Sequence, residues 1–153
     1  MSNNIRAINY LDKHRHLVQN LAQRGASQSL FSTIRDLLCF ASLLGYSRNN
    51  KSPLGNEAKA PSVEIQQFES TNADDYIYMI AAAEHNDIDV LREGRTEDII
   101  ETFEEYVNGG LDIIQSWLDD YNDPLGFEAI IKGLESDNLI ALETNAEKIS
   151  IDF

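Results

Sequence analysis

The stretch FEEYVNGGLDII, residues 103–114, places two adjacent glycines inside a run with helical periodicity. A glycine in a helix interior costs roughly 1 kcal/mol relative to alanine, because its backbone loses more freedom on folding. The apolar positions nevertheless continue through the pair, three or four residues apart and without a change of phase. They are Ile100, Phe103, Val107, Gly110, Ile114, Trp117 and Tyr121. We therefore predict one long helix from Thr96, with Gly110 on its buried side.

A missing side chain at Gly110 would let a second helix approach closely, either from this chain or from a second subunit. The alternative is a helix that ends at Gly109 and a new one from Leu111, because glycine is the usual residue after a helix C-terminus. The candidate helix-packing interface consists of Phe103, Tyr106, Val107, Gly110, Ile114 and Trp117.

Upstream of this helix the pattern is also helical. Residues 5–23 predict a basic amphipathic helix that ends near Gly25, and residues 29–46 predict a helix that is apolar on nearly every side and therefore central. Residues 47–61 contain three of the turn-forming Pro and Gly residues and predict a flexible loop. The alternation in VEIQQF, residues 63–68, indicates one short strand.

Further helices are expected at ADDYIYMIAAAE, residues 73–84, and at FEAIIKGLE, residues 127–135, followed by a polar C-terminal tail over residues 139–153. At 153 residues the chain has the size of one ordinary domain. The predicted fold is all-α: a single compact domain over residues 1–153, with five or six helices and at most one short β element.

The charge is distributed unevenly along the chain. The net charge is −14, but residues 1–61 carry eight Lys or Arg against three Asp or Glu, whereas residues 62–153 carry four against twenty-three. Such asymmetry bears on partners and association rates rather than on fold. The candidate DNA contacts are Arg6, Lys13, Arg15 and Arg24. The candidate acidic partner face, on the polar side of the long helix, is Glu101, Glu104, Glu105, Asp112 and Asp119. For both sets the plain alternative is a solvated helix surface.

No catalytic motif is present: the sequence has no G-x-S-x-G, no P-loop and no G-x-G-x-x-G. His14 and His16, two residues apart, point to opposite sides of a helix, so we predict surface histidines rather than a shared metal site. Cys39 lies in an apolar run, where burial makes a thiol inert. We predict no enzyme activity, no cofactor and no metal. A single cysteine, no leader pattern and no long apolar run lead us to expect a cytoplasmic protein.

Three stretches together resemble a known family: residues 32–48 (STIRDLLCFASLLGYSR), 77–93 (IYMIAAAEHNDIDVLRE) and 99–118 (IIETFEEYVNGGLDIIQSWL). They are similar to DNA phosphorothioation-associated protein 4, also called dnd system-associated protein 4. The phrase F-E-E-Y-x-N-G-G-L, residues 103–111, is the most specific part, and the resemblance covers most of residues 5–125. It implies a bacterial DNA phosphorothioation-linked modification or anti-phage restriction system, and it transfers no catalytic residue.

The resulting hypothesis is a non-catalytic accessory protein that binds other proteins of such a system through its acidic surface. The basic N-terminal helix would add contacts to double-stranded DNA. Two alternatives remain open: a homo-oligomeric DNA-binding protein, and an acidic protein that imitates DNA and inhibits a DNA-binding partner.

Overall fold

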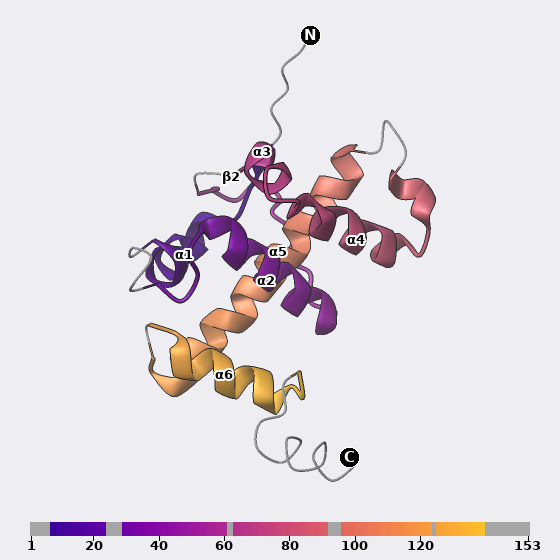
Figure 1. Cartoon of the computed structure of the whole chain (residues 1–153). Helices are drawn as coiled ribbons and strands as arrows, with labels where there is room; N and C mark the ends of the chain where they lie inside the picture. The colour runs from indigo at the N-terminus through magenta and orange to yellow at the C-terminus, as the bar shows by residue number, and fades with distance from the viewer. Residues whose placement is uncertain (1–6, 24–28, 61–62, 92–95, 124, 140–153) are drawn as a thin grey trace.

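The computed structural model describes residues 7–23, 29–60, 63–91, 96–123 and 125–139. Within these ranges it contains six α-helices and one antiparallel pair of short strands, which confirms the predicted mainly helical fold (Figure 1). In chain order the elements are β1 (Ala7–Ile8), the 3-10 turn η1 (Asp12–His14), α1 (Arg15–Ala22), α2 (Ile34–Ser47), β2 (Val63–Glu64), α3 (Ile65–Glu69), α4 (Asp74–His85), the 3-10 turn η2 (Ile88–Leu91), α5 (Thr96–Tyr121) and α6 (Phe127–Ser136).

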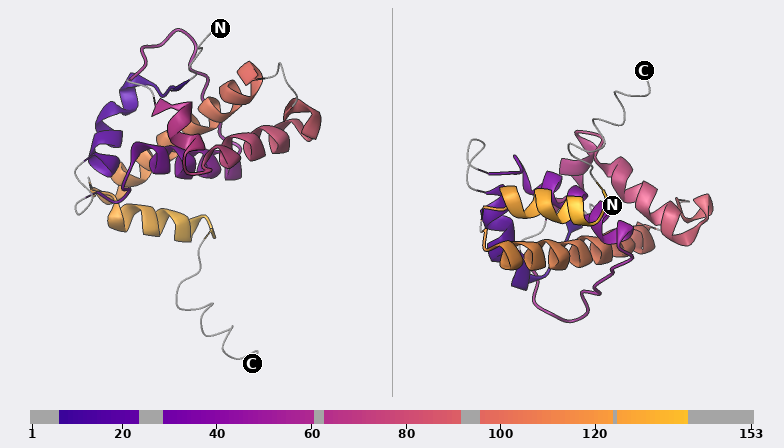
Figure 2. Two further views of the ribbon diagram at one scale, coloured as in Figure 1. Left: turned by 45° about the horizontal axis from the view of Figure 1, so that its top comes forward. Right: turned by 90° about the horizontal axis from the view of Figure 1, so that it is seen from below.

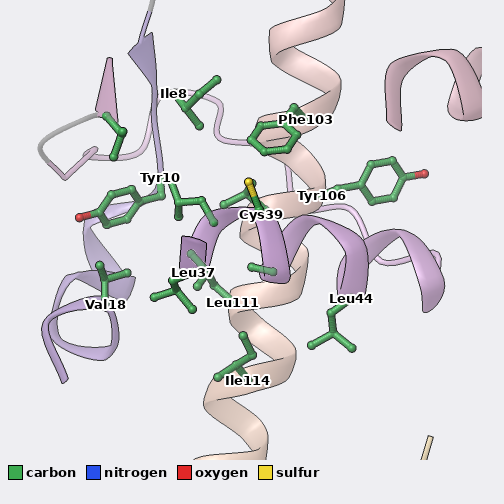
Figure 3. Close-up of a cluster of buried hydrophobic side chains, with 14 of the residues drawn as sticks. Ile8, Tyr10, Val18, Leu37, Cys39, Leu44, Phe103, Tyr106, Leu111 and Ile114 are labelled. Atoms are coloured by element: carbon green, nitrogen blue, oxygen red, sulfur yellow. The ribbon is translucent and has the colours of Figure 1, made fainter. Parts of the chain in front are cut away.

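The helix α5 is the centre of the molecule. It runs unbroken for 26 residues, which confirms the prediction of one helix through the glycine pair. The other helices pack around it, α2 most extensively, followed by α4 and α6 (Figure 1). Figure 3 shows the core between α5 and α2, to which Phe103, Leu111 and Ile114 of α5 and Leu37 and Leu44 of α2 contribute side chains.

Gly110 lies where α5 crosses α2. A Cβ atom added to it would overlap the carbonyl oxygen of Ala41 on α2, and a Cβ atom at Gly45 would overlap the carbonyl oxygen of Tyr106 on α5. The two helix backbones therefore touch directly, and side chains on either helix would hold them apart. The close approach predicted from the sequence is made within one chain, by α2.

The N-terminal segment is not the single helix predicted from the sequence. Its helical part is shorter, over Arg15–Ala22, and Ile8 pairs instead with Val63 in the β1–β2 ladder. The backbone of Tyr10 accepts a hydrogen bond from Ala60 N at 2.9 Å, and Asp12 N donates to Ala58 O at 2.9 Å. In an extended conformation this backbone forms hydrogen bonds with residues 58–64, so it does not need the internal hydrogen bonds of a helix. The apolar spacing of Ile8 and Leu11 fits a helix and an extended segment equally well.

Residues 48–60 form a loop, as predicted, and specific hydrogen bonds hold it against α5. The side chain of Asn50 donates to Gly109 O at 2.9 Å, and Ser52 N donates to Glu105 O at 3.0 Å. A Cβ atom at Gly109 would overlap the carbonyl oxygen of Asn50, so the second glycine of the pair makes room for the loop. Flexibility of this loop stays a prediction.

The helix α6 lies alongside the C-terminal half of α5 (Figure 2). The Asp123 carboxylate caps its first turn by accepting hydrogen bonds from Glu128 N at 2.9 Å and Ala129 N at 3.1 Å. Gly133 faces the indole ring of Trp117, which leaves no space for a Cβ atom. In the described part of the chain no helix has the length and apolar character needed to cross a membrane.

Candidate functional site

Three side chains on one side of α5 bind the N-terminal segment; we call Glu104, Asn108 and Asp112 the polar row of α5. Glu104 accepts hydrogen bonds from Asn9 N at 2.7 Å and from Asn9 Nδ2 at 3.0 Å. Asn108 Oδ1 accepts one from Leu11 N at 2.8 Å, and its amide donates to Glu104 O at 2.7 Å. Glu104 and Asn108 are both buried, and the bond from Leu11 N satisfies a backbone donor that water does not reach.

The distance between successive residues in each segment explains why the polar row of α5 can bind residues 9–13. Neighbouring members of the polar row are four residues apart on a helix, a rise of about 6 Å. Asn9 and Leu11 are two residues apart on an extended chain, a distance of about 6.6 Å. The steps are nearly equal, so successive turns of α5 meet alternate residues of the extended segment.

Asp112 binds three groups at the end of this row. Its carboxylate lies 3.3 Å from Lys13 Nζ and 3.2 Å from His14 Nε2, and it accepts a hydrogen bond from Ser52 Oγ at 2.7 Å. His14 is buried, and its Nε2 is close to Asp112 without the alignment of a hydrogen bond. Burial lowers the pKa of His14, although the Asp112 charge acts in the opposite direction. The prediction of a surface histidine is therefore wrong for His14.

The candidate DNA contacts do not form a free basic surface among the described residues. Lys13 pairs with Asp112, and Arg15 donates to Asp12 at 2.6 Å. Arg6 and Arg24 lie outside the described residues. The side chains of Lys13 and Arg15 are thus close to carboxylates of the same chain, which weakens their attraction for phosphate.

The five candidate acidic residues are not one exposed face. Glu101 and Asp119 are exposed, Glu105 and Asp112 are half-buried, and Glu104 is buried against Asn9. The prediction of an exposed acidic surface is therefore wrong for Glu104. The physical reason is that residues 9–13 and the 48–60 loop cover the middle of this side of α5 and use its oxygens as acceptors.

An acidic groove of about 410 Å³ remains open between the first half of α5 and the loop. It is lined by Glu97, Glu101, Glu104 and Glu105 of α5 and by Pro53, Leu54, Gly55 and Lys59 of the loop. Burial, followed by the neighbouring Glu101 charge, raises the pKa of Glu105. Lys59 Nζ donates to Gly55 O at 3.2 Å and is held on the loop side.

A second polar cluster connects α4, α5 and the loop. Glu84 of α4 accepts hydrogen bonds from Lys51 Nζ at 2.5 Å and from the Tyr106 hydroxyl at 2.5 Å. The Lys51 ammonium also lies 5.7 Å from the centre of the Tyr106 ring. The hydrogen bond from Lys51, and then that from Tyr106, lowers the pKa of Glu84, and the bond to Glu84 raises the pKa of Lys51. Both pKa shifts are those expected when Lys51 and Glu84 form an ion pair with each other, which joins the loop to α4.

The six candidate packing residues are all buried. Phe103 packs edge-on against Phe68 of α3, with ring centres 5.9 Å apart, and Trp117 covers Gly133 of α6. Tyr106 packs edge-on against Tyr46 of α2 at 5.4 Å. These contacts occupy the predicted helix-packing surface with other helices of the same chain.

Two further observations concern Cys39 and metal binding. Burial raises the pKa of the Cys39 thiol to about 11, so it is protonated near neutral pH. Among the residues that the structure describes, no three His, Cys, Asp or Glu side chains are placed to hold a metal ion.

Sequence reasoning missed Asn108, and it did not identify the partners of His14 and Glu84. Asn108 left a signal, because an asparagine within the buried stretch of a helix needs hydrogen-bond partners. His14 and Glu84 left none, since their partners Asp112 and Lys51 are distant in the sequence.

A family model described as DNA sulphur modification system-associated protein 4 matches residues 8–149. No curated protein and no solved structure matches the chain significantly.

Proposed function

Because this chain belongs to the family of DNA sulphur modification system-associated protein 4, we propose that it is a non-catalytic accessory protein of a bacterial phosphorothioation-linked system. It would bind a basic segment of another protein of that system along the acidic groove. The observation that supports this most directly is the groove itself, about 410 Å³ in volume and lined by four glutamates. Opposite charge in such a surface raises the association rate and excludes acidic partners.

Direct DNA binding has less support. The net charge of −14 repels phosphate, and the described candidate contacts Lys13 and Arg15 have carboxylate neighbours. A protein that binds duplex DNA through several phosphates needs a cluster of Lys and Arg side chains that pair with those phosphates and not with its own carboxylates.

The proposal is tested by affinity purification from the native host, with the captured proteins identified by mass spectrometry. We expect wild-type protein to capture proteins of the sulphur modification system, and the yield to fall as NaCl rises from about 0.05 to 0.5 M, because salt screens exposed charges. The double variant Glu101→Gln/Glu105→Gln should capture several-fold less.

The matched control is Asp120→Asn/Glu135→Gln, which removes two exposed charges that do not line the groove. It should capture wild-type amounts. Capture that is indifferent to salt and to Glu101 and Glu105 would contradict the proposed surface, and no captured system protein would contradict the proposed function. If duplex DNA displaces the captured partner, the acidic groove occupies a DNA-binding site, and the DNA-imitation alternative replaces the accessory role.

A further inference from the structure

The helix α4 is apolar on all sides over much of its length. Residues 76–83, YIYMIAAA, contain no charged residue in eight positions. A helix with this pattern is normally buried all round. Here only Ile77, Ile80 and Ala81 are buried, whereas Tyr76 is 39%, Tyr78 38% and Met79 52% exposed. The side of α4 that faces away from α5 is therefore exposed, although its apolar sequence is typical of a buried helix.

We call Tyr76, Tyr78, Met79 and Ala83 the outer face of α4. Tyr76, Met79 and Ala83 are three, four or seven residues apart and lie side by side in one strip, whereas Tyr78 points about 100° away from Met79 and borders the exposed side on its other flank. Surface patches of this kind mark interaction sites more often than scattered apolar residues do.

Carboxylates lie at both ends of this face. Asp74 and Asp75 form the first turn of α4, and Asp87 and Asp89 follow its last turn. After burial, the charges of Asp74, Glu69 and Asp75 raise the pKa of the Tyr78 phenol, as expected for acids close to that ring. The sequence of α4 contains no Lys or Arg.

These charges decide between possible occupants. A second copy of this chain would bring another acidic rim and a net charge of −14 against the first, and nucleic acid would bring phosphates. Like charges placed opposite each other disfavour both of these occupants. A basic protein segment instead supplies cations for the rim.

We propose that the outer face of α4 is a docking site for a partner segment that presents apolar side chains flanked by Lys or Arg. Apolar side chains would pack on Met79, whose flexible thioether adapts to irregular surfaces. The cations would lie over the rings of Tyr76 and Tyr78 and beside Asp74 and Asp75. This inference rests on the proposed function only in assigning the segment to a protein of the sulphur modification system.

The methionine content provides a sharp test. The chain has two methionines, Met1 and Met79, so a ¹³C-methyl-methionine spectrum reports directly on the outer face of α4. The probe is a synthetic helical peptide with leucines on one side and arginines beside them. Two peptides serve as comparisons: one of identical composition with the leucine stripe scrambled, and one with glutamate in place of arginine.

We expect the Met79 methyl signal to shift saturably with the arginine–leucine peptide and at least tenfold more weakly with the other two. The variant Tyr76→Ser/Tyr78→Ser keeps the Met79 reporter and should weaken binding at least fivefold. The variant Phe127→Ser/Ile131→Ser is the matched control, because those two α6 side chains are each 47% exposed, and it should bind like wild type.

No shift with the arginine–leucine peptide, or equal shifts with all three peptides, would overturn the inference. A Met79 shift that depends on protein concentration alone would do the same, because it would identify a second copy as the occupant. Affinity capture separates this result from the proposed function. If Tyr76→Ser/Tyr78→Ser captures system proteins at the wild-type level, the docking site is wrong and the accessory role stands.

Discussion

Gly110 shows how one absent side chain sets the distance between two helices. Alanine at this position would gain roughly 1 kcal/mol of helix propensity. Its Cβ atom would also overlap the carbonyl oxygen of Ala41, and a backbone atom inside a packed helix cannot move aside cheaply. We therefore expect Gly110→Ala to lower the free energy of unfolding by about 3 kcal/mol or more, measured by urea denaturation.

Ser116→Ala is the control for Gly110→Ala, because Ser116 is exposed on the same helix. It should change the free energy of unfolding by less than about 0.5 kcal/mol. A Gly110→Ala protein as stable as wild type would contradict direct contact between the α2 and α5 backbones.

His14 predicts a pH dependence of stability. Burial lowers its folded-state pKa below the ordinary 6.5, so the unfolded chain takes up the proton first as the pH falls. The contribution of His14 to stability is thus complete above pH 6.5 and declines below it, by at most about 1.4 kcal/mol per pH unit for one proton.

Urea midpoints measured between about pH 7.5 and 5.5 test this prediction. His14→Gln should flatten the dependence within that window, whatever its effect at neutral pH. His16→Gln, at an exposed position of α1, should retain the wild-type slope. Equal slopes for wild type and His14→Gln would contradict a buried, neutral His14.

At the scale of elements, the polar row of α5 joins a helix to an extended segment. Asn108→Ala removes the acceptor for Leu11 N and leaves that buried donor unpaired, which costs about 1–3 kcal/mol. We expect this loss of stability together with faster hydrogen exchange at the Leu11 amide, measured by NMR. Gln115→Ala, which removes an exposed bond to Asp119, should change neither quantity appreciably. Unchanged protection at Leu11 would exclude the proposed pairing.

The helices could be predicted where a long stretch of sequence keeps a helical apolar spacing. The helix α5 was predictable because its apolar spacing survives the glycine pair, and the helix expected at residues 127–135 is α6. The strand β1 could not be predicted, since its partner Val63 lies far along the chain. Ile8 and Leu11 satisfy a helical spacing equally well, and the tertiary partners decided the outcome.

The candidate site was less predictable than the fold. The helical wheel correctly places Glu101 and Asp119 in solvent, but Glu104 lies on the same side and is buried. The difference lies in what covers each residue, which depends on residues 9–13 and 48–60. Periodicity within α5 contains no information about those segments.

At the scale of the whole molecule, folding brings the two oppositely charged parts of the sequence together. Lys13 pairs with Asp112, Arg48 with Asp137 and Lys51 with Glu84. Each pair joins a base from the first 61 residues to an acid from the remainder. The basic N-terminal part is therefore partly neutralised by the chain itself, and the folded surface is mainly acidic.

This excess charge predicts that salt stabilises the protein. Exposed ion pairs contribute about 0–1 kcal/mol each and weaken as salt is added. Repulsion within a chain of net charge −14 is also screened, and it involves many more charges. We expect the melting temperature to rise by a few degrees between about 0.02 and 0.3 M NaCl at pH 7.5, measured by calorimetry.

Near the isoelectric point of about 4.4, the same salt series should leave the melting temperature almost unchanged, because the net charge is then close to zero. A melting temperature that falls with salt at pH 7.5 would show that the ion pairs outweigh the repulsion.

The contact of Gly110 with Ala41 also has a kinetic consequence. These residues are about 70 positions apart, so their meeting closes a long loop, and its entropic cost precedes any gain from packing. The glycine pair makes α5 unstable as an isolated helix, so α5 becomes stable only when it packs against α2. We expect the encounter of these two helices to limit the rate of folding, and the helix signal and the burial of Trp117 to develop together rather than in sequence.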